Sequence, residues 1–327
     1  MRRSILAIVG ALALAGCGAS SSQHAAPRAQ AQPRALTLML DWTPNPDHLA
    51  IFTAKRKGYF AAAGLRVTVR TPSDPTTPLK LVAAGRVDLA VSYEPELFFA
   101  AEKRLPVVAV ASLVPRPLDS LISLRPLPSL AGRSVGITGV PTDDAFLATL
   151  LAHSDTPRAR VKVVHVGYNL VPALLAHRVD AILGGYRNVE GIQLEQRGLR
   201  PSILPVDRGG VPHYDELVVA ANANRLRRDT AYAAAVTRFV AALARGNRAA
   251  VSDPRAALAA AEAETASPAA FLRRSVRATT RLLPGAPCLS QPQWAAFGEW
   301  MYSHKLVSRR VAAPEVMATA YLPRGCG

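Results

Sequence analysis

Cysteine is scarce in this sequence, with only three among 327 residues. No Cys-x-x-Cys pair and no Cys/His ligand spacing occurs, so the sequence predicts no structural metal site. The histidines do not form a zinc-type motif either, and a hydrolase is therefore not expected. These absences favour a protein that carries neither a bound metal nor a cofactor.

Long apolar runs are also rare. Residues 5–14 form an apolar stretch that follows two arginines and is too short to remain as a mature membrane-spanning helix, and no later segment has 18 uninterrupted apolar residues. It ends in Leu-Ala-Gly-Cys17, which resembles a bacterial lipobox and implies cleavage before Cys17 and lipidation of that residue. An ordinary secretory signal is the alternative. We predict a lipoprotein signal peptide over residues 1–16 and a flexible tether over residues 17–34.

Acidic residues are fewer than basic ones, 23 against 39, which gives a net charge of +16. An excess of this size can indicate a nucleic-acid or anionic-membrane partner. The basic residues, however, are mostly arginines spread over the whole length. No zinc-finger, basic-zipper or RNA-recognition signature is present. We therefore predict a basic surface and no nucleic-acid partner.

What the sequence does contain is a regular alternation of short apolar runs and helical patterns. Residues 36–40 and 65–70, for example, read as strands in such an alternation. This pattern predicts an α/β fold built from doubly wound sheets flanked by helices. Residues 80–91 are similar to residues 173–183, since each segment contains a helix, a tight turn, Arg-Val-Asp and a strand. The internal similarity predicts two similar lobes.

The predicted lobes divide the chain into three stretches. Residues 35–124 and 217–327 are expected to form lobe 1, and residues 125–216 are expected to form lobe 2. Residues 121–124, together with the prolines after them, indicate a crossing between the lobes. The Ala-rich helices that follow Arg228 are expected to pack on lobe 1.

Two cysteines remain after the predicted lipidation site, Cys288 and Cys326. In an oxidising exported compartment such a pair suggests a disulfide that ties down the C-terminal tail. Two free thiols are the alternative. The pair is therefore a candidate disulfide that the fold has to place within bonding distance.

Polar and aromatic residues follow predicted strands in both halves of the chain. In a two-lobed α/β protein these strand ends face each other across a cleft. Aromatic rings can stack on a flat ligand, and amide, carboxylate and imidazole groups can fix its edges. Half-buried lobe residues and helix caps are the alternative for each of them. The candidate ligand-binding residues are Trp42, Asn45, His48, Tyr93, Glu94, Tyr168, Asn169, Tyr186, Asn188 and Glu190.

Three of these strand-end motifs resemble a known family. They are Asp41-Trp-Thr-Pro-Asn-Pro-Asp-His48, Ser92-Tyr-Glu94 and Gly185-Tyr-Arg-Asn-Val-Glu-Gly191. Together they are similar to the thiamine-precursor, hydroxymethylpyrimidine-type periplasmic binding proteins, and the similarity extends over about residues 36–220. The resemblance implies a type II periplasmic-binding-protein fold with a ligand cleft between two lobes. It also implies a pyrimidine that stacks between aromatic rings, with Glu190 at its amino edge.

The same resemblance implies a biological setting. The chain would be an exported monomer, anchored by lipidated Cys17 to the outer face of the bacterial cytoplasmic membrane. Its partners would be a pyrimidine-type small molecule and an ABC permease with its ATPase. It would catalyse no reaction and hold no cofactor.

Two other functions are considered beside this one. Related lipoproteins capture alkylsulfonates, nitrate-like anions or other small organic molecules, using helix N-termini, Ser, Thr and Arg instead of a cleft glutamate. A eukaryotic branch of the resembled family is an enzyme that makes the thiamine pyrimidine. The cofactor lysine of that branch aligns with Ser92 and its consumed histidine with Glu96, so its chemistry is not expected here.

Overall fold

The computed structural model describes residues 32–326. The predicted signal peptide, the lipidation site Cys17 and almost all of the predicted tether lie outside the described residues. Within residues 32–326, no helix is both long enough and apolar enough to cross a bilayer.

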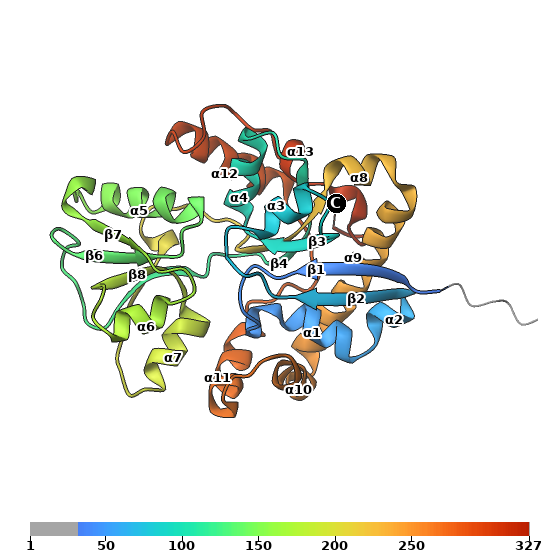
Figure 1. Cartoon of the computed structure of the whole chain (residues 1–327), viewed down its shortest axis with the longest axis horizontal. Coiled ribbons are helices and arrows are strands. Elements are labelled where there is room, and N and C mark those ends of the chain that lie inside the picture. Colours follow the sequence, from blue (N-terminus) through green and yellow to red (C-terminus); the bar gives the residue numbers. More distant parts are fainter. Residues whose placement is uncertain (1–31, 327) are drawn as a thin grey trace, which may run out of the picture. The chain divides into compact units, whose positions relative to one another are not determined.

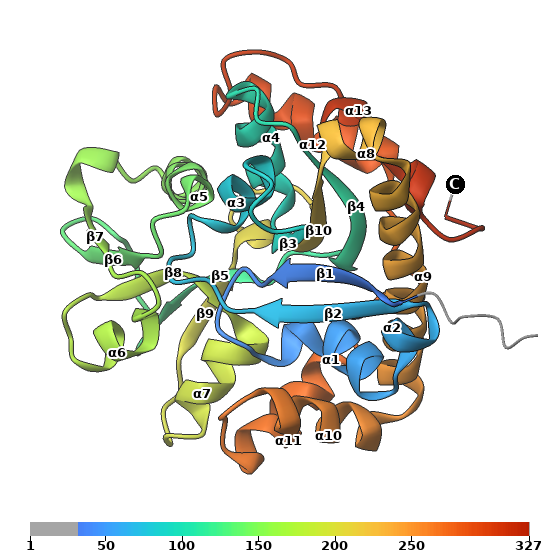
Figure 2. The same ribbon diagram turned by 45° about the vertical axis from the view of Figure 1, so that its right-hand side comes forward.

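Two five-stranded mixed sheets form the framework of residues 33–326 (Figures 1 and 2). The first sheet has the order β2-β1-β3-β10-β4 and contains β1 (Arg34–Met39), β2 (Leu65–Arg70), β3 (Leu89–Ser92), β4 (Val107–Val114) and β10 (Leu217–Asn222). The second has the order β7-β6-β8-β5-β9 and contains β5 (Asp119–Ser123), β6 (Ser134–Ile137), β7 (Lys162–His165), β8 (Ala181–Tyr186) and β9 (Ser202–Pro205).

The two sheets share one topology. In the first, β1 pairs in parallel with β2 and β3, whereas β10 runs antiparallel to β3 and β4. In the second, β6 pairs in parallel with β7 and β8, whereas β5 runs antiparallel to β8 and β9. The repeated segments found in the sequence become two helix–strand units, α3 (Pro78–Ala83) with β3 and α6 (Leu170–Leu175) with β8, which occupy equivalent places. The prediction of two similar lobes is confirmed.

The prediction for residues 121–124 is wrong in one respect. Residues 121–123 belong to strand β5, which pairs with β8 and β9 of the second sheet. The chain crosses from the first sheet to the second earlier, between β4 and β5. The prolines that follow β5 suggested a connection, but they only end the strand, because proline cannot donate a backbone hydrogen bond to a sheet.

Helices cover the faces of both sheets (Figure 2). One side of the first sheet packs against α1 (Leu49–Arg56), α2 (Tyr59–Ala62), α8 (Ala223–Arg228), α9 (Thr230–Ser252), α10 (Pro254–Glu264) and α11 (Ala269–Thr279). The other side packs against α3 (Pro78–Ala83), α4 (Glu94–Glu102), α12 (Gln291–Ser303) and α13 (Ala313–Val316). The second sheet is covered by α5 (Pro141–His153), α6 (Leu170–Leu175) and α7 (Ile192–Glu195). The C-terminal helices therefore pack on the first lobe, as the sequence predicts.

Helices α1 and α9 approach each other closely at Gly246. A Cβ atom at this position would lie 2.3 Å from the carbonyl oxygen of Ala50 and 2.6 Å from Cβ of Ala54. Because the obstacle includes backbone, Gly246→Ala must push the two helices apart, and we expect it to cost about 1–3 kcal/mol of stability. Gly285→Ala is the matched control, since a Cβ there meets nothing within 4 Å. Equal melting temperatures of the two variants in circular dichroism would contradict this close approach.

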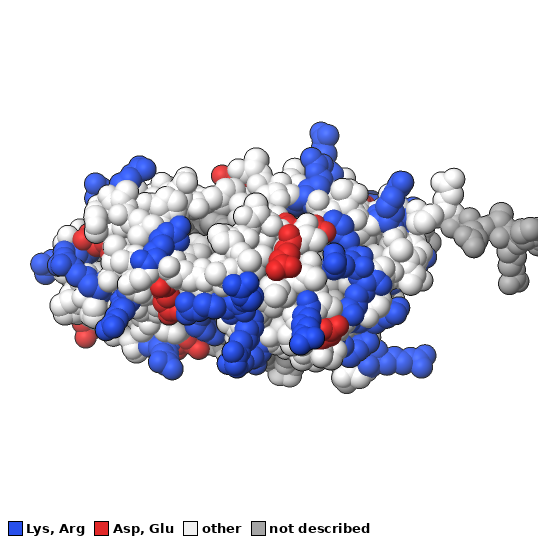
Figure 3. Space-filling view, turned by 90° about the horizontal axis from the view of Figure 1, so that it is seen from below, with Lys and Arg blue, Asp and Glu red and all other residues white. Residues whose placement is uncertain are grey.

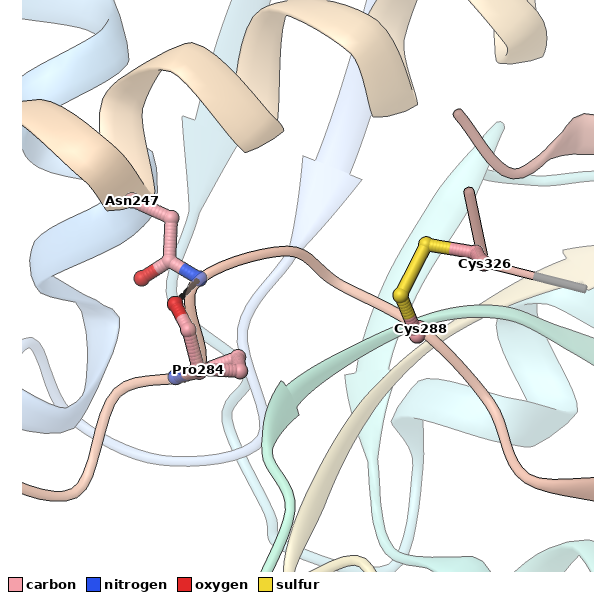
Figure 4. Close-up of a disulfide and its surroundings, with 4 residues drawn as sticks. All are labelled: Asn247, Pro284, Cys288 and Cys326. Atoms are coloured by element: carbon pink, nitrogen blue, oxygen red, sulfur yellow. Dashed lines mark hydrogen bonds between the residues drawn. A yellow bond between two sulfur atoms is a disulfide. The ribbon is translucent and has the colours of Figure 1, made fainter. Parts of the chain in front are cut away.

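Cys288 and Cys326 are joined by a disulfide in the structure (Figure 4). The bond connects the loop before α12 with the C-terminal segment. The same loop is held to α9, because the side-chain amide of Asn247 donates a hydrogen bond to the carbonyl oxygen of Pro284 at 2.6 Å. The end of the chain is thereby fastened to the first lobe.

Candidate functional site

A small cavity of about 30 Å³ lies between the two sheets. This is room for one or two water molecules, so the lobes have to part before a larger molecule can enter. Its walls come from the turns that follow β1, β3, β6 and β8, where the carboxyl ends of parallel strands meet. Half of the residues predicted from the sequence lie on its surface, namely Trp42, Asn45, Tyr93, Tyr186 and Glu190. The sequence analysis missed another set of polar lining residues, which includes Asp41, Asp119, Thr138, Asp143 and Glu216.

Two tyrosine rings of the cavity are held in place by their hydroxyl groups. Tyr93 donates to Oδ2 of Asp41 at 2.9 Å, and Tyr186 donates to Oε1 of Glu216 at 3.1 Å. Burial, with the nearby carboxylates as a further cause, raises the pKa of both tyrosines well above its usual value. Both phenols therefore stay protonated. Their rings come from opposite lobes, and each is available to contact a flat ligand.

His48 does not line the cavity, contrary to the prediction. Its Nδ1 accepts the backbone N–H of Asn45 at 3.3 Å, so the ring proton lies on Nε2. That proton points to Oδ1 of Asp41, 2.8 Å away. His48 therefore fixes Asp41, and Asp41 in turn holds Tyr93. The histidine is a positioning residue because the short helix at Pro46–His48 turns its side chain inward.

Glu190 lies on a π-helical turn, Arg187–Gly191, directly after β8. Its Oε2 accepts the backbone N–H of Tyr186 at 2.8 Å. Among the hydrogen bonds of residues 32–326, none reaches Oε1. Burial raises the pKa of Glu190 to about 7. One carboxylate oxygen is thus held by the protein, and the other is free to accept a hydrogen bond from a molecule in the cavity.

Two further carboxyl groups come from the second lobe. Oδ1 of Asp119 accepts the backbone N–H of Gly184 at 2.8 Å. Oδ2 of Asp143 accepts from the hydroxyl of Thr138 and from the N–H of Gly139, both at 2.7 Å. Burial raises the pKa of Asp143 to about 7 and that of Asp119 well above its usual value. The sequence suggested that Asp143 was only a helix cap.

Glu216 connects the two segments that cross between the lobes. Its Oε2 accepts the backbone N–H groups of Leu118 and Asp119 at 2.6 and 2.8 Å, and the hydroxyl of Tyr214 at 2.8 Å. With the Tyr186 hydroxyl on Oε1, four donors converge on one carboxylate. Glu216 therefore joins one crossing to the other beneath the cavity.

Besides His48, four predicted residues do not line the cavity: Glu94, Tyr168, Asn169 and Asn188. Glu94 is buried at the start of α4, where it accepts from the N–H of Asp215 and the side-chain amide of Gln293. Its side chain therefore faces α12 instead of the cleft.

The other three lie at the back or the rim. The side-chain amide of Asn188 donates to Oδ1 of Asp47 at 2.6 Å and to the hydroxyl of Thr279 at 2.8 Å, so it joins the lobes behind the cavity. Asn169 is exposed before α6. Tyr168 lies outside the lining but packs edge-on against Trp42, with ring centroids 4.4 Å apart.

Contacts across the rim bring the lobes together. The hydroxyl of Tyr168 donates to the carbonyl oxygen of Pro72 at 3.2 Å. In a second contact between the lobes, Oε1 of Glu96 accepts hydrogen bonds from the N–H of Thr142, at 2.9 Å, and from its hydroxyl. Both contacts join the first lobe to the second beside residues of the cavity wall, Trp42 and Thr142.

The charge of the cavity is opposite to that of the outer surface. Lys and Arg side chains predominate on the face shown in Figure 3. The cavity, in contrast, is lined by five carboxyl groups and by no Lys, Arg or His among the described residues. An anion in this cavity would meet no cationic side chain of the lining. A ligand rich in hydrogen-bond donors, or one that carries positive charge, fits it better.

Comparisons with known proteins agree with this architecture. A sequence model of the family described as "NMT1/THI5 like" matches residues 45–257. The chain is 41% identical over 197 residues to a thiamine biosynthesis protein of Haemophilus influenzae, a match that covers 58% of this chain and 62% of that protein. It is 39% identical over 191 residues to a formylaminopyrimidine-binding protein of Halalkalibacterium halodurans, covering 57% of this chain and 58% of that one. The matched part thus spans less than two thirds of the length of these relatives.

A solved structure shares the fold at low sequence identity. The alkanesulfonate-binding protein SsuA of Xanthomonas axonopodis, bound to MOPS, superimposes with a TM-score of 0.68 and 18% identity. The superposition covers 88% of this chain and 99% of that one. The fold of residues 32–326 is therefore the type II periplasmic-binding-protein fold that the sequence predicts.

Proposed function

Because the chain belongs to the NMT1/THI5-like family, we propose that it is the ligand-binding lipoprotein of an ABC importer and that it captures a thiamine-type aminopyrimidine. In this proposal it is exported, is anchored through lipidated Cys17 to the outer face of the bacterial cytoplasmic membrane, and acts as a monomer. It closes on its ligand by a hinge motion of the lobes and delivers the ligand to a permease and its ATPase.

The observation that carries this proposal is the composition of the cavity walls. Trp42 and Tyr93 lie on the first lobe, and Tyr186 and Glu190 lie on the second. Aromatic faces from both sides suit a small planar heterocycle. The free oxygen Oε1 of Glu190 suits an exocyclic amino group at the edge of such a ring.

The alternative ligand class, alkylsulfonates or nitrate-like anions, has less support. An anion site needs N–H groups or cationic side chains directed at the ligand. The lining described above contains five carboxyl groups and no cationic side chain. The likeness to an alkanesulfonate-binding protein at 18% identity concerns the fold.

We also propose that the protein catalyses no reaction. The eukaryotic enzymes of the family have a cofactor lysine and a consumed histidine at the positions of Ser92 and Glu96. In this chain Glu96 accepts hydrogen bonds from Thr142. The sequence does contain a Gly-x-Ser-x-Gly string at residues 132–136. Its Ser134, however, begins strand β6 and donates to Asp180, whereas a nucleophilic serine of this motif stands on a strand-to-helix turn.

The test is a ligand panel measured by thermal shift and titration calorimetry. We expect 4-amino-5-hydroxymethyl-2-methylpyrimidine to raise the melting temperature, and thiamine, riboflavin and an alkanesulfonate to have little effect. Tyr186→Ala should weaken binding of the pyrimidine at least about tenfold, because a stacked base contributes roughly 1–3 kcal/mol. Tyr302→Ala, outside the cavity, is the matched control. A shift by the sulfonate without one by any aminopyrimidine would replace this proposal by the alternative.

A further inference from the structure

Three buried carboxyl groups of the second lobe each keep one oxygen free. Asp119, Asp143 and Glu190 are only 5%, 1% and 8% exposed. Each uses one oxygen for hydrogen bonds within the protein. Among the hydrogen bonds of residues 32–326, none reaches Oδ2 of Asp119, Oδ1 of Asp143 or Oε1 of Glu190. All three residues line the cavity.

Gly184 brings two of these carboxyl groups to the same place. Its N–H donates to Asp119, and a Cβ atom built on it would lie 3.3 Å from Oδ1 of Asp143. Such an atom would also lie 2.7 Å from Cγ2 of Thr138, and Gly184 has a φ of +94°. A side chain at this position would therefore be strained and would crowd the space beside Asp143. Asp119 and Asp143 flank Gly184, while Glu190 belongs to the separate turn after β8.

The protein provides no positive charge for this pair. The ring proton of His48 is directed at Asp41 on the other lobe. The guanidinium of Arg187 donates to the carbonyl oxygen of Pro117 and does not line the cavity. The nearby Glu216 brings no cation to the site either, since its four hydrogen-bond donors are all neutral groups. A positive charge that balances Asp119 and Asp143 therefore has to come from a bound ligand.

We propose that Asp119 and Asp143 form an ammonium subsite, so that the preferred ligand is an aminopyrimidine that carries a protonated primary amine on a short arm. This inference rests on the proposed function and narrows its ligand class. A primary ammonium presents three N–H donors and one positive charge, which matches the two free oxygens of Asp119 and Asp143 beside Gly184. The ring amino group then remains for Glu190, and the ring plane for the tyrosines.

The electrostatics of the empty cavity agree with this assignment. Burial without a compensating cation raises the pKa of Asp143, and burial together with the charges of Glu216 and Asp143 raises that of Asp119. A bound ammonium group would favour the ionised form of both. A metal ion is a poorer candidate, because no group of three or more His, Cys, Asp or Glu side chains in the described chain is placed to hold one.

The experiment compares two ligands of nearly the same shape and different charge. The 4-amino-5-aminomethyl and 4-amino-5-hydroxymethyl forms of 2-methylpyrimidine are titrated calorimetrically into the protein at pH 7.5, together with the N-formylated amine. We expect the aminomethyl form to bind at least tenfold more tightly than either neutral compound. Asp119→Asn and Asp143→Asn should each reduce this ratio at least about fivefold. Glu195→Gln removes one exposed negative charge outside the cavity and should leave the ratio unchanged.

The outcomes distinguish a failure of the ammonium subsite from a failure of the pyrimidine site. If the neutral pyrimidines bind as tightly as the amine, or if both Asn variants keep the wild-type ratio, the ammonium subsite is wrong and the pyrimidine site stands. If no pyrimidine binds while a sulfonate does, the proposed function fails and the subsite fails with it. Each Asn side chain retains an oxygen for the bond that its Asp makes with the backbone, and circular dichroism of both variants verifies their fold.

Discussion

Replacing Glu216 by alanine is expected to destabilise the protein by about 3–5 kcal/mol, because each buried donor left without an acceptor costs roughly 1–3 kcal/mol. The change leaves the N–H groups of Leu118 and Asp119 and the hydroxyls of Tyr214 and Tyr186 without their acceptor. Water in the cavity can reach Tyr186 most easily, whereas Leu118 is fully buried. Most of the cost therefore arises at the crossing segments.

Urea denaturation of the ligand-free protein measures this effect. Glu299→Ala is the matched control, because Glu299 is exposed and its ion pair with Arg310 should contribute less than about 1 kcal/mol. If Glu216→Ala unfolds at the same urea concentration as Glu299→Ala, the four hydrogen bonds do not hold the crossings together. A loss of several kcal/mol in the Glu216 variant alone would identify this carboxylate as the connection between them.

Much of the framework could be predicted because its signals are local. The apolar runs at residues 36–40 and 65–70 became β1 and β2, and the two Arg-Val-Asp repeats became equivalent units of the two sheets. Trp42, Tyr93 and Tyr186 were identified because each directly follows a strand. Strand ends that share one sheet edge meet in space whatever the intervening sequence, so position in the chain was enough.

The acidic half of the cavity could not be predicted in this way. Asp119 and Glu216 are 97 residues apart in the chain and meet only because both crossings pass the same point. No periodic pattern in the sequence marks either one. Asp143 has a sequence signal, since it follows a predicted strand as Trp42 does, but the same position also suits a helix cap.

Glu94 and Glu96 show a second limit of predicting site residues from the sequence. Both lie in the first turn of α4, two residues apart, and either is a plausible cleft residue from the sequence. Residues two apart point in different directions on a helix. The packing of α12 against α4 turns Glu94 toward Gln293, and the second lobe receives Glu96 at Thr142. Only the tertiary arrangement decides which glutamate reaches the opposite lobe.

Glu190→Gln is expected to stabilise the ligand-free protein at pH 8 by roughly 3 kcal/mol, and to have little effect at pH 4. Burial raises the pKa of Glu190 from 4.5 to about 7, and each pKa unit corresponds to about 1.4 kcal/mol. Below pH 4.5 the carboxyl group is protonated in the folded and unfolded chains alike. As the pH rises through 7, the folded protein has to hold a buried charge, so the stabilising effect of the raised pKa is lost.

The glutamine side chain resembles the protonated acid, and its oxygen can still accept the N–H of Tyr186. The difference in unfolding free energy between wild type and Glu190→Gln should therefore grow between pH 4.5 and pH 7 and then level off. Glu195→Gln, at an exposed glutamate, should give no comparable growth. Parallel stability curves for wild type and Glu190→Gln would mean that the carboxylate is well solvated in the folded protein. An enclosed cavity with one free oxygen of Glu190 directed at the ligand would then be untenable.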